Sequence, residues 1–337
     1  MKLRVLPCLL LCLLLLSGCT AQAEPVEATF FAMDTIMTLR VYGGDQALLD
    51  RLQGEVLRLE GLWSVTDGDS EIFAANHALG SPVTVSEDTA ALIFQALELG
   101  QDTGGALALT IRPVVQAWGF TTGEYQIPSQ EELDGLLPLV DDSRVELDGT
   151  SLTLPDGAEL DLGAVAKGYT GQHLARLIRE VGVTSALLDL GGNIQTVGCR
   201  PDGDPWRVAV RDPEGEGYAA VLEVEDEAVV TSGGYERYFE QDGVRYWHIL
   251  DPATGQPART GLLSVTVVGP SGTVCDALST ALFVMGPERA ADYWLAREDF
   301  DFLLLHEDGS VTCSEGLEGR LTLSGDWADR EIEVVRR

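Results

Sequence analysis

The stretch from Ser185 to Val268 constrains the fold more than any other part of the sequence. It alternates short runs rich in β-branched and aromatic residues with turn-forming pairs, namely Gly191-Gly192, Asp242-Gly243 and Thr254-Gly255. This alternation predicts a region that is mostly β-sheet with tight connections. Helical and strand patterns elsewhere follow one another without a regular strand–helix–strand repeat. The sequence therefore predicts an α+β fold and argues against a doubly wound parallel sheet.

The spacing of apolar residues predicts the other elements. A strand is expected over residues 28–42, which are rich in Thr, Phe, Ile and Val, and a helix follows it from Leu48 to Leu59. A hairpin is expected over residues 144–161, with its turn at Asp148-Gly149. The remaining expected elements are helices over 86–100, 165–181 and 276–285, a helix after Pro287, and strands at 302–305, 311–313 and 331–335.

The N-terminus has the features of a bacterial export signal. Two positive charges, on Lys2 and Arg4, precede the apolar run from Leu9 to Leu16. This run is long enough for the core of a signal peptide and too short to cross a bilayer. It ends in Leu16-Ser17-Gly18-Cys19, where small residues stand directly before a cysteine. An ordinary secretory signal with a chance cysteine is the alternative, but the cysteine comes where the apolar run stops.

This arrangement is typical of a lipoprotein signal. We expect residues 1–18 to be removed and Cys19 to carry the lipid, so that the protein is exported and held at the outward face of the cell membrane. Residues 19–27 predict a short tether, which leaves residues 28–337 as a single folded domain.

The charge of the chain limits its partners. The formal net charge is −32, and it becomes −34 when Lys2 and Arg4 leave with the signal. Such a surface repels nucleic acid and anionic lipid headgroups. The sequence therefore predicts no nucleic-acid partner, and it predicts attachment to the membrane through the lipid. Solubility outside the cell is the more ordinary reason for the acidity.

The cysteines do not form a framework for disulfides or zinc. Of the six cysteines, Cys8 and Cys12 leave with the signal and Cys19 is acylated, which leaves Cys199, Cys275 and Cys313. An odd number argues against a disulfide framework, and the sequence has no CxxC or Cys/His cluster of the kind that holds zinc. A single disulfide stays open at this point.

The segment from Val274 to Leu282 carries the sharpest chemical signal. On a helix, positions i and i+4 share a face, so Asp276 and Thr280 would present a carboxylate and a hydroxyl together, with Ser279 beside them. Hard oxygen donors of this kind suit magnesium. The alternative is that Asp276 only caps the helix while Thr280 bonds back to a carbonyl.

Three further segments are candidates for ligand contacts. Residues 159–168 predict a strand that ends on Asp161, turns through Gly163 and enters a helix, whose first amides and Lys167 could hold an anion. The segment lacks a P-loop pattern, and turning the chain is its ordinary role. The Gly pairs at 191–192 and 233–234 permit close approach to a ligand, although tight turns are the commoner reason for such pairs. His248 precedes an Asp-Pro-x-Thr-Gly turn and could donate a hydrogen bond to a diphosphate, or serve only as a core or capping histidine.

Taken together and in this order, eight segments resemble the ApbE flavin transferase family, the FAD:protein FMN transferases. The resemblance runs from Phe30 to Thr322. The segments are 32–35, 69–72 followed by Asn76, 103–110 followed by 118–120, 161–169, 188–193, 230–235, 248–255 and 276–286. No single segment is decisive, but eight in the family's order are hard to obtain by chance. The fold implied is ApbE-like and related to the T-fold, with mixed, largely antiparallel sheets and packed helices.

The resemblance implies an enzyme that splits the diphosphate of FAD, transfers the FMN half to a Thr or Ser hydroxyl of an acceptor protein and releases AMP. Magnesium is the implied metal, because phosphoryl transfer needs a cation that bridges phosphate oxygens. Asp276 and Thr280 match the family's metal ligands, Ser279 stands at an adjoining position of the metal site, and Ala164 is expected to offer its main-chain carbonyl. Asp276 would also help to deprotonate the attacking hydroxyl.

The resemblance also implies contacts to FAD. They are placed at Met33, Ala106, Leu107, Ala108, Asp161, Lys167, Leu250 and, near the diphosphate, His248. The sequence departs from the family at Leu107-Ala108, where Phe-Asp is common, and at Thr66, where an aromatic residue is frequent. The first change removes a side-chain carboxylate contact and the second removes a stacking ring, and neither touches the expected metal site.

The implied partners are membrane-associated acceptor proteins of electron-transfer complexes. Two other functions stay open at this stage. One is an FAD pyrophosphatase, in which water replaces the acceptor hydroxyl and free FMN and AMP are released. The other is a lipid-anchored protein that binds FAD without catalysis. The presence of all the family's metal positions argues against the second.

Overall fold

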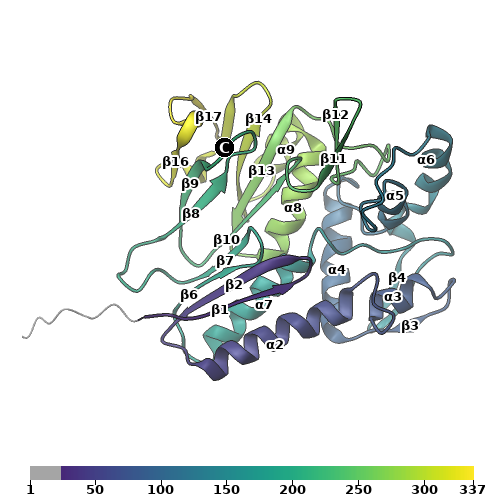
Figure 1. The fold of residues 1–337 in the computed structure, drawn as a ribbon, viewed down its shortest axis with the longest axis horizontal. Helices are drawn as coiled ribbons and strands as arrows, with labels where there is room; N and C mark the ends of the chain where they lie inside the picture. The colour runs from purple at the N-terminus through teal and green to yellow at the C-terminus, as the bar shows by residue number, and fades with distance from the viewer. Residues whose placement is uncertain (1–23) are drawn as a thin grey trace, which may run out of the picture.

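A nine-stranded sheet connects the first strand of the described chain to the last (Figure 1). The computed structural model describes residues 24–337. In the sheet, all neighbouring strands are antiparallel except β15 and β17. Its strands, in spatial order, are β1 (Val26–Ala32), β2 (Thr35–Tyr42), β6 (Ser185–Asp189), β7 (Asn193–Val197), β10 (Ala228–Gly233), β13 (Leu262–Gly269), β14 (Asp301–His306), β15 (Val311–Ser314) and β17 (Ile332–Val335).

Three smaller sheets surround the main one. Their strands are β8 (Trp206–Arg211), β9 (Tyr218–Val224) and β16 (Leu321–Leu323) in the first, β3 (Val83–Thr84), β4 (Glu146–Asp148) and β5 (Ser151–Thr153) in the second, and β11 (Tyr238–Gln241) with β12 (Val244–Trp247) in the third. The first of these covers one face of the main sheet, where Val208 and Leu222 pack with Val229, Val268 and Leu303.

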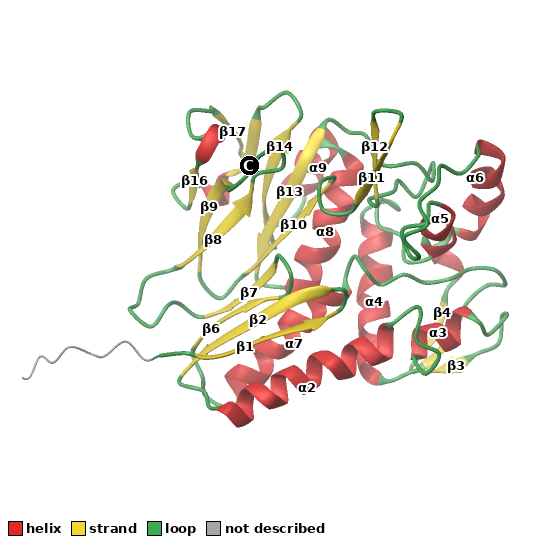
Figure 2. Cartoon of the chain, in the orientation of Figure 1, coloured by secondary structure: helices red, strands yellow, loops and turns green. Residues whose placement is uncertain are grey.

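Helices cover the opposite face of the main sheet (Figure 2). The helices of residues 24–337 are α2 (Gln46–Trp63), α3 (Glu71–Asn76), α4 (Glu87–Asp102), α5 (Arg112–Ala117), α6 (Gln130–Leu136), α7 (Ala166–Glu180), α8 (Gly272–Met285) and α9 (Pro287–Leu295). Of these, α2, α7 and α8 pack on strands of the main sheet. Short 3-10 turns lie at 137–139, 142–144, 315–317 and 325–327. α8 is buried on nearly every side, because it lies between the sheet and helices α4 and α7. None of the helices in residues 24–337 is both long and apolar enough to span a bilayer.

Helices α7 and α8 cross at a contact between two glycines. A Cβ atom at Gly168 would lie 2.2 Å from the carbonyl oxygen of Gly272, and one at Gly272 would lie 2.5 Å from the carbonyl oxygen of Gly168. Real Cβ atoms do not approach other atoms so closely, so the main chains meet only because both positions lack a side chain.

Most elements predicted from the sequence are present. The region from Ser185 to Val268 contains eight strands, the hairpin turns beside Asp148, and the helices predicted at 86–100 and 165–181 are α4 and α7. Ser86 caps α4 by accepting a hydrogen bond from the amide of Thr89 at 3.3 Å. The prediction of an α+β fold with largely antiparallel sheets is confirmed.

Two of the predicted boundaries that were wrong lie in segments beside a cavity. The single strand expected over residues 28–42 is a hairpin of β1 and β2, which turns at Met33 and Asp34 with φ of 48° and 59°. Two positive φ angles define a tight hairpin turn, and the sequence hid it because neither residue is glycine. The helix expected from Asp276 begins four residues earlier, at Gly272, and Ser271 caps it.

The N-terminal predictions are only partly covered by the structure. The predicted signal of residues 1–18 and the lipidated Cys19 lie outside the described residues. The tether predicted over 19–27 overlaps the fold, because β1 already begins at Val26. In the described part of the chain, Cys199, Cys275 and Cys313 are all free thiols.

We predict that Gly272→Ala lowers the free energy of unfolding by roughly 1–3 kcal/mol, because the added methyl group would overpack the crossing of α7 and α8. Gly61→Ala is the matched control, since Gly61 lies within α2 and a Cβ there meets no atom within 4 Å. The control should gain about 0.5–1 kcal/mol, because alanine favours the helix. Urea denaturation of both variants measures the difference, and equal stabilities would contradict the close crossing.

Candidate active site

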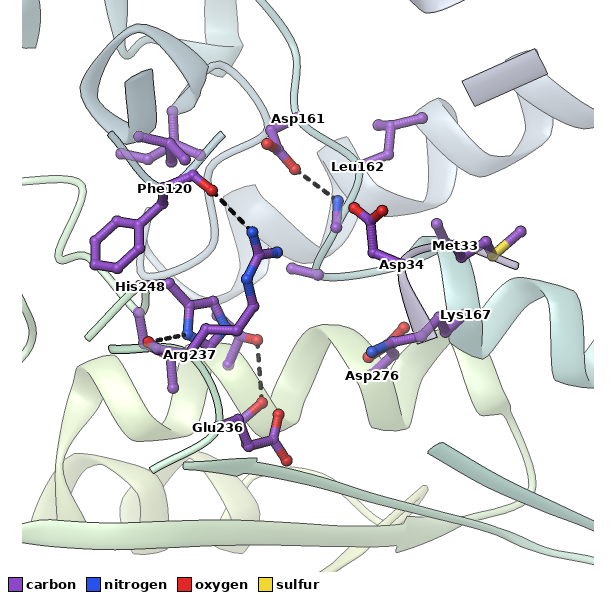
Figure 3. A pocket seen from close by; sticks show the side chains of 18 of the residues that line it. Met33, Asp34, Phe120, Asp161, Leu162, Lys167, Glu236, Arg237, His248 and Asp276 are labelled. Carbon is purple, nitrogen blue, oxygen red and sulfur yellow. Dashed lines mark hydrogen bonds between the residues drawn. The ribbon is translucent and has the colours of Figure 1, made fainter. Parts of the chain in front are cut away.

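The segments singled out in the sequence converge on one cavity of about 560 Å³ (Figure 3). Eleven of the twelve predicted ligand and metal residues line it, and Ser279 is the exception. They are Met33, Ala106, Leu107, Ala108, Asp161, Ala164, Lys167, His248, Leu250, Asp276 and Thr280. They come from the β1–β2 turn, the loop after α4, the segment that leads into α7 with the first turn of that helix, the segment after β12 and the middle of α8. A cavity of this size suits a small molecule.

Asp276 is the buried anion of the cavity. It is 5% exposed, and its Oδ2 accepts a hydrogen bond of 2.7 Å from the amide of Gly168, in the first turn of α7. Burial raises the pKa of Asp276, while Lys167 and the Gly168 amide oppose that rise. The carboxylate therefore serves as the N-terminal cap of α7, which has no capping side chain of its own. The simpler role considered for Asp276, capping its own helix, is excluded, because Ser271 fills that position.

Hydroxyl groups lie beside Asp276. Thr280, one turn further along α8, lines the cavity, and its Oγ1 lies 3.3 Å from the Oγ of Ser232 on β10. Ser279 is fully buried, donates to the carbonyl of Asp276 at 2.8 Å and lies 2.8 Å from Ser232. The structure thus brings Asp276 and Thr280 to the cavity wall, as predicted from their spacing, and places Ser279 behind that wall.

The donor set around Asp276 fits a hard cation. Residues 24–337 contain no cluster of three or more His, Cys, Asp or Glu side chains that could hold a metal. A cation here would depend on one carboxylate, the Thr280 hydroxyl and main-chain oxygens such as that of Ala164, with phosphate completing the shell. The amide of Asn193 also lines the cavity, is 3% exposed and lies close enough to Asp276 to oppose the rise in the pKa of that carboxyl.

Charged groups face the same end of the cavity. Lys167 and Asp276 interact electrostatically, and both also interact with the nearby carboxyl group of Glu236. The pKa of Glu236 is raised, first because the cavity walls displace water and then because Asp276 repels its charge. Arg237 donates to the carbonyl of Phe120 at 2.8 Å, which holds a second cation at the rim.

His248 is held as a neutral imidazole. Its Nδ1 lies 3.1 Å from the carbonyl oxygen of Arg237, and its ring lies edge-on to Phe120. A carbonyl can only accept, so Nδ1 carries the hydrogen and Nε2 is left as an acceptor. Burial and the neighbouring Arg237 lower the pKa of His248 to about 4. At neutral pH this ring accepts at Nε2, and the donation to a diphosphate that we considered from the sequence would require its protonation.

The β1–β2 turn forms one wall of the cavity. Met33 and Asp34 line it, and the amide of Met33 donates to the carboxylate of Glu60 on α2 at 2.7 Å. This bond fastens a turn whose two residues have positive φ, so Glu60 compensates part of the cost of that conformation.

Asp142 positions the loop that carries Ala106, Leu107 and Ala108. Its carboxylate accepts hydrogen bonds from the amides of Leu109 and Thr110 at 2.8 and 2.9 Å. Ala106, Leu107 and Ala108 line the cavity and have no polar side chain, so a polar contact between this loop and a ligand would have to come from its main chain.

The segment around Asp161 differs from the prediction. No strand ends at Asp161, since β5 already ends at Thr153. Glu159 forms an isolated bridge with Ile111, and the amide of Asp161 donates to the carbonyl of Leu109 at 2.8 Å. The Asp161 carboxylate accepts from the amide of Gly163 at 2.8 Å and so shapes the turn into α7. The first amides of α7 were expected to bind an anion, and the anion that the Gly168 amide holds is the chain's own Asp276.

Sequence reasoning missed several residues of the cavity. They are Glu60, Glu236 and Arg237, together with Asp34, Asn193 and Ser232, which lie within the segments singled out in the sequence but were given no role of their own. The two Gly pairs were the available signal for some of them. Gly191 and Gly192 make the tight turn between β6 and β7 and also line the cavity, whereas Gly233 ends β10. Glu236 and Arg237 lie in an irregular segment without a periodic pattern, so only the fold shows their position.

The fold and the cavity define a class of protein. One end of the cavity offers a carboxylate, hydroxyls and a lysine, and apolar side chains such as Ile111, Val115 and Leu250 also line the wall. An enzyme that binds a metal–phosphate group together with a large aromatic portion needs this division of polarity.

Comparisons with known proteins identify the family. The profile of the ApbE family matches residues 33–304. The FAD:protein FMN transferase of Treponema pallidum is 35% identical over 329 residues, covering 90% of this chain and 91% of that protein. The FAD:protein FMN transferase of Escherichia coli (strain K12) is 34% identical over 275 residues, covering 78% of this chain and 77% of that one. The chain belongs to the ApbE family.

Solved structures agree with this assignment. The crystal structure of the ApbE protein from Thermotoga maritima has a TM-score of 0.82 at 31% identity, covering 88% of this chain and 99% of that one. The flavin transferase ApbE from Vibrio cholerae has a TM-score of 0.78 at 29% identity, covering 90% and 98%. The ApbE-like fold predicted from the sequence is confirmed.

We predict that His248 makes the stability of the protein depend on pH. The pKa of His248 falls from 6.5 to about 4 on folding, so the unfolded chain binds more protons between these values. The contribution of His248 to the free energy of unfolding is therefore fully present above pH 6.5 and is lost as the pH falls toward 4. His248→Asn should reduce this loss by at most about 1.4 kcal/mol per pH unit. Urea denaturation from pH 4 to 7 measures both slopes, and identical slopes would contradict the prediction.

Proposed function

We propose that this protein transfers the FMN portion of FAD to a Thr or Ser hydroxyl of an acceptor protein and releases AMP, with magnesium as the cofactor. The observation that carries the proposal is the convergence of Asp276, Thr280, Lys167 and the Ala164 segment on one end of the cavity. The FAD:protein FMN transferases that this chain resembles along most of its length support the same reaction.

The metal would be held by the Asp276 carboxylate, the Thr280 hydroxyl and the main-chain carbonyl of Ala164. Bound there, magnesium supplies a positive charge that polarises the diphosphate oxygens. Ser279 would support this site from behind. Its hydroxyl donates to the carbonyl of Asp276 and can therefore accept from the hydroxyl of Ser232, which lies 2.8 Å away. A cation would also favour the charged form of Asp276, whose pKa is raised by burial.

The chain's own groups then have separate roles in the transfer. Lys167 neutralises charge on the phosphates, and the amide of Asn193, which lines the same cavity, can bind a phosphate or ribityl oxygen. Asp276 accepts the proton of the acceptor hydroxyl as that oxygen attacks the FMN phosphorus. The bond between this phosphorus and the bridging oxygen breaks, and the oxygen leaves with AMP. The main-chain groups at 106–108 and the apolar wall hold the flavin.

We also propose that the protein acts outside the cell while anchored through Cys19. The spacing of the signal and the cysteine supports this location. β1 begins seven residues after Cys19, so the tether is short and the cavity stays close to the bilayer. Membrane-associated electron-transfer proteins are the acceptors that such a position would favour.

We predict that Asp276→Asn lowers flavin transfer by roughly 10²-fold or more, because it removes the carboxylate that holds the metal and receives the proton. The assay incubates the protein with FAD, magnesium and an acceptor, which is an FMN-carrying subunit of a membrane redox complex prepared without its flavin. Covalent flavin fluorescence of the acceptor in denaturing gels measures the transfer. Asp292→Asn is the control, because Asp292 is exposed on α9 and away from the cavity.

The same assay separates the competing functions. Chelator should abolish labelling of the acceptor, and labelling that persists in chelator would contradict the role of the metal. Free FMN without a labelled acceptor would instead show a pyrophosphatase. FAD that stays intact in the presence of magnesium and acceptor would show a binding protein without catalysis.

We predict that Cys19→Ala moves the protein from the membrane fraction to a soluble fraction, because the residue that carries the lipid is lost. Fractionation of cells followed by immunoblotting measures the change. Cys199→Ala is a matched control, since Cys199 is a free thiol within the folded domain. A membrane-bound Cys19→Ala variant would rule out the lipid anchor.

A further inference from the structure

The β1–β2 hairpin presents an apolar pair to solvent. Phe31 is 66% exposed and Ile36 is 65% exposed, and the two residues are directly paired across the strands. On the same face, Thr29 contacts Thr38 at 3.1 Å and Glu27 pairs with Arg40. The small sheet of β8, β9 and β16 covers the middle of this face of the main sheet, at Val229 and Leu303, but Phe31 and Ile36 remain exposed.

The outer edge of β1 is open in the described part of the chain. β1 ends the nine-stranded sheet and pairs only with β2. In a hairpin with a two-residue turn, the residues that close the turn, Ala32 and Thr35, exchange hydrogen bonds, and the pairs alternate from there. The main-chain groups of Phe31 and Thr29 therefore point away from β2. Unpaired strand edges of this kind accept an additional strand.

This open edge leads directly to the cavity. The turn after Phe31 consists of Met33 and Asp34, both of which line the cavity. On the other strand, Thr35 packs closely on Gly191, which is another residue of the cavity wall. A Cβ atom at position 191 would lie only 2.1 Å from the Oγ1 of Thr35. A segment bound along β1 would therefore end at the mouth of the cavity.

We propose that the outer edge of β1, together with Phe31 and Ile36, receives an extended segment of the acceptor protein as an added strand. The proposal rests on the proposed function, which requires that a hydroxyl of a protein, and not of a small molecule, enters the cavity. Pairing along β1 would place a Thr or Ser next to Met33, while an apolar side chain of the acceptor contacts Phe31 and Ile36. Main-chain and apolar contacts also suit an enzyme with a net charge of −32, because they do not depend on the charge of the acceptor.

The test replaces both exposed apolar side chains in the full chain. In the transfer assay, Phe31→Ser with Ile36→Ser should raise the KM for the flavin-free acceptor subunit by about tenfold or more and leave the dissociation constant for FAD unchanged. Neither residue lines the cavity. Phe94→Ser is the control, because Phe94 is 55% exposed on α4 and lies outside the cavity lining; its KM should equal that of the wild type.

A second variant tests the strand pairing itself. Thr29→Pro removes an amide that points away from β2 and should therefore be tolerated by the hairpin, while Thr29→Ala keeps that amide. We expect the proline variant to raise the acceptor KM and the alanine variant to leave it close to the wild-type value. Circular dichroism confirms that both variants are folded.

The outcomes separate this proposal from the one on which it depends. A wild-type protein that labels no acceptor contradicts the transferase function and this surface with it. Normal transfer by the variants at Phe31 and Ile36, or an equal loss in Phe94→Ser, overturns the docking surface alone. A change in the oligomeric state of the Phe31 and Ile36 variants without a change in acceptor KM would also overturn the docking surface, because the surface would then join two copies of the chain. A loss of FAD affinity would also overturn it.

Discussion

The contact between Gly168 and Gly272 determines how the chemistry of this protein is arranged. Because neither residue has a side chain, helices α7 and α8 approach until their main chains touch. At that distance the amide of Gly168 reaches the carboxylate of Asp276 and is capped by it. The same approach sets Lys167 beside Asp276, so a buried negative charge, a helix N-terminus and a cation share one end of the cavity.

The rest of the cavity depends on supports that lie outside it. Glu60 fastens the β1–β2 turn, and Asp142 fastens the loop at 106–108. The carbonyl of Arg237 fixes the neutral form of His248. Each support is a charged or polar group bonded to main chain or ring atoms, so the groups that face a ligand are held in place before it binds. Preorganised groups lose little entropy on binding, which suits phosphoryl transfer.

Particular residues show how far the sequence could be interpreted. The i, i+4 spacing of Asp276 and Thr280 predicted that both would share a helix face, and both line the cavity, because the helical period is a local property. Ser279 was grouped with them, yet it is fully buried behind the cavity wall. The spacing of residues along a helix does not tell which residues at the edge of a face reach the cavity. Glu236 and Arg237 gave no signal, because they lie in an irregular segment whose position depends on neighbouring strands.

The sequence by itself determined the α+β class, most helices and strands, the family and eleven of the residues that line the cavity, because these follow from local periodicity and from motifs in a recognisable order. The tertiary structure alone decided which groups meet. It showed that Asp276 caps α7 and not its own helix, that residues 28–42 fold into a hairpin, and that β1 leaves an open edge beside the cavity. The physical reason is that contacts between distant segments depend on packing, which no local pattern records.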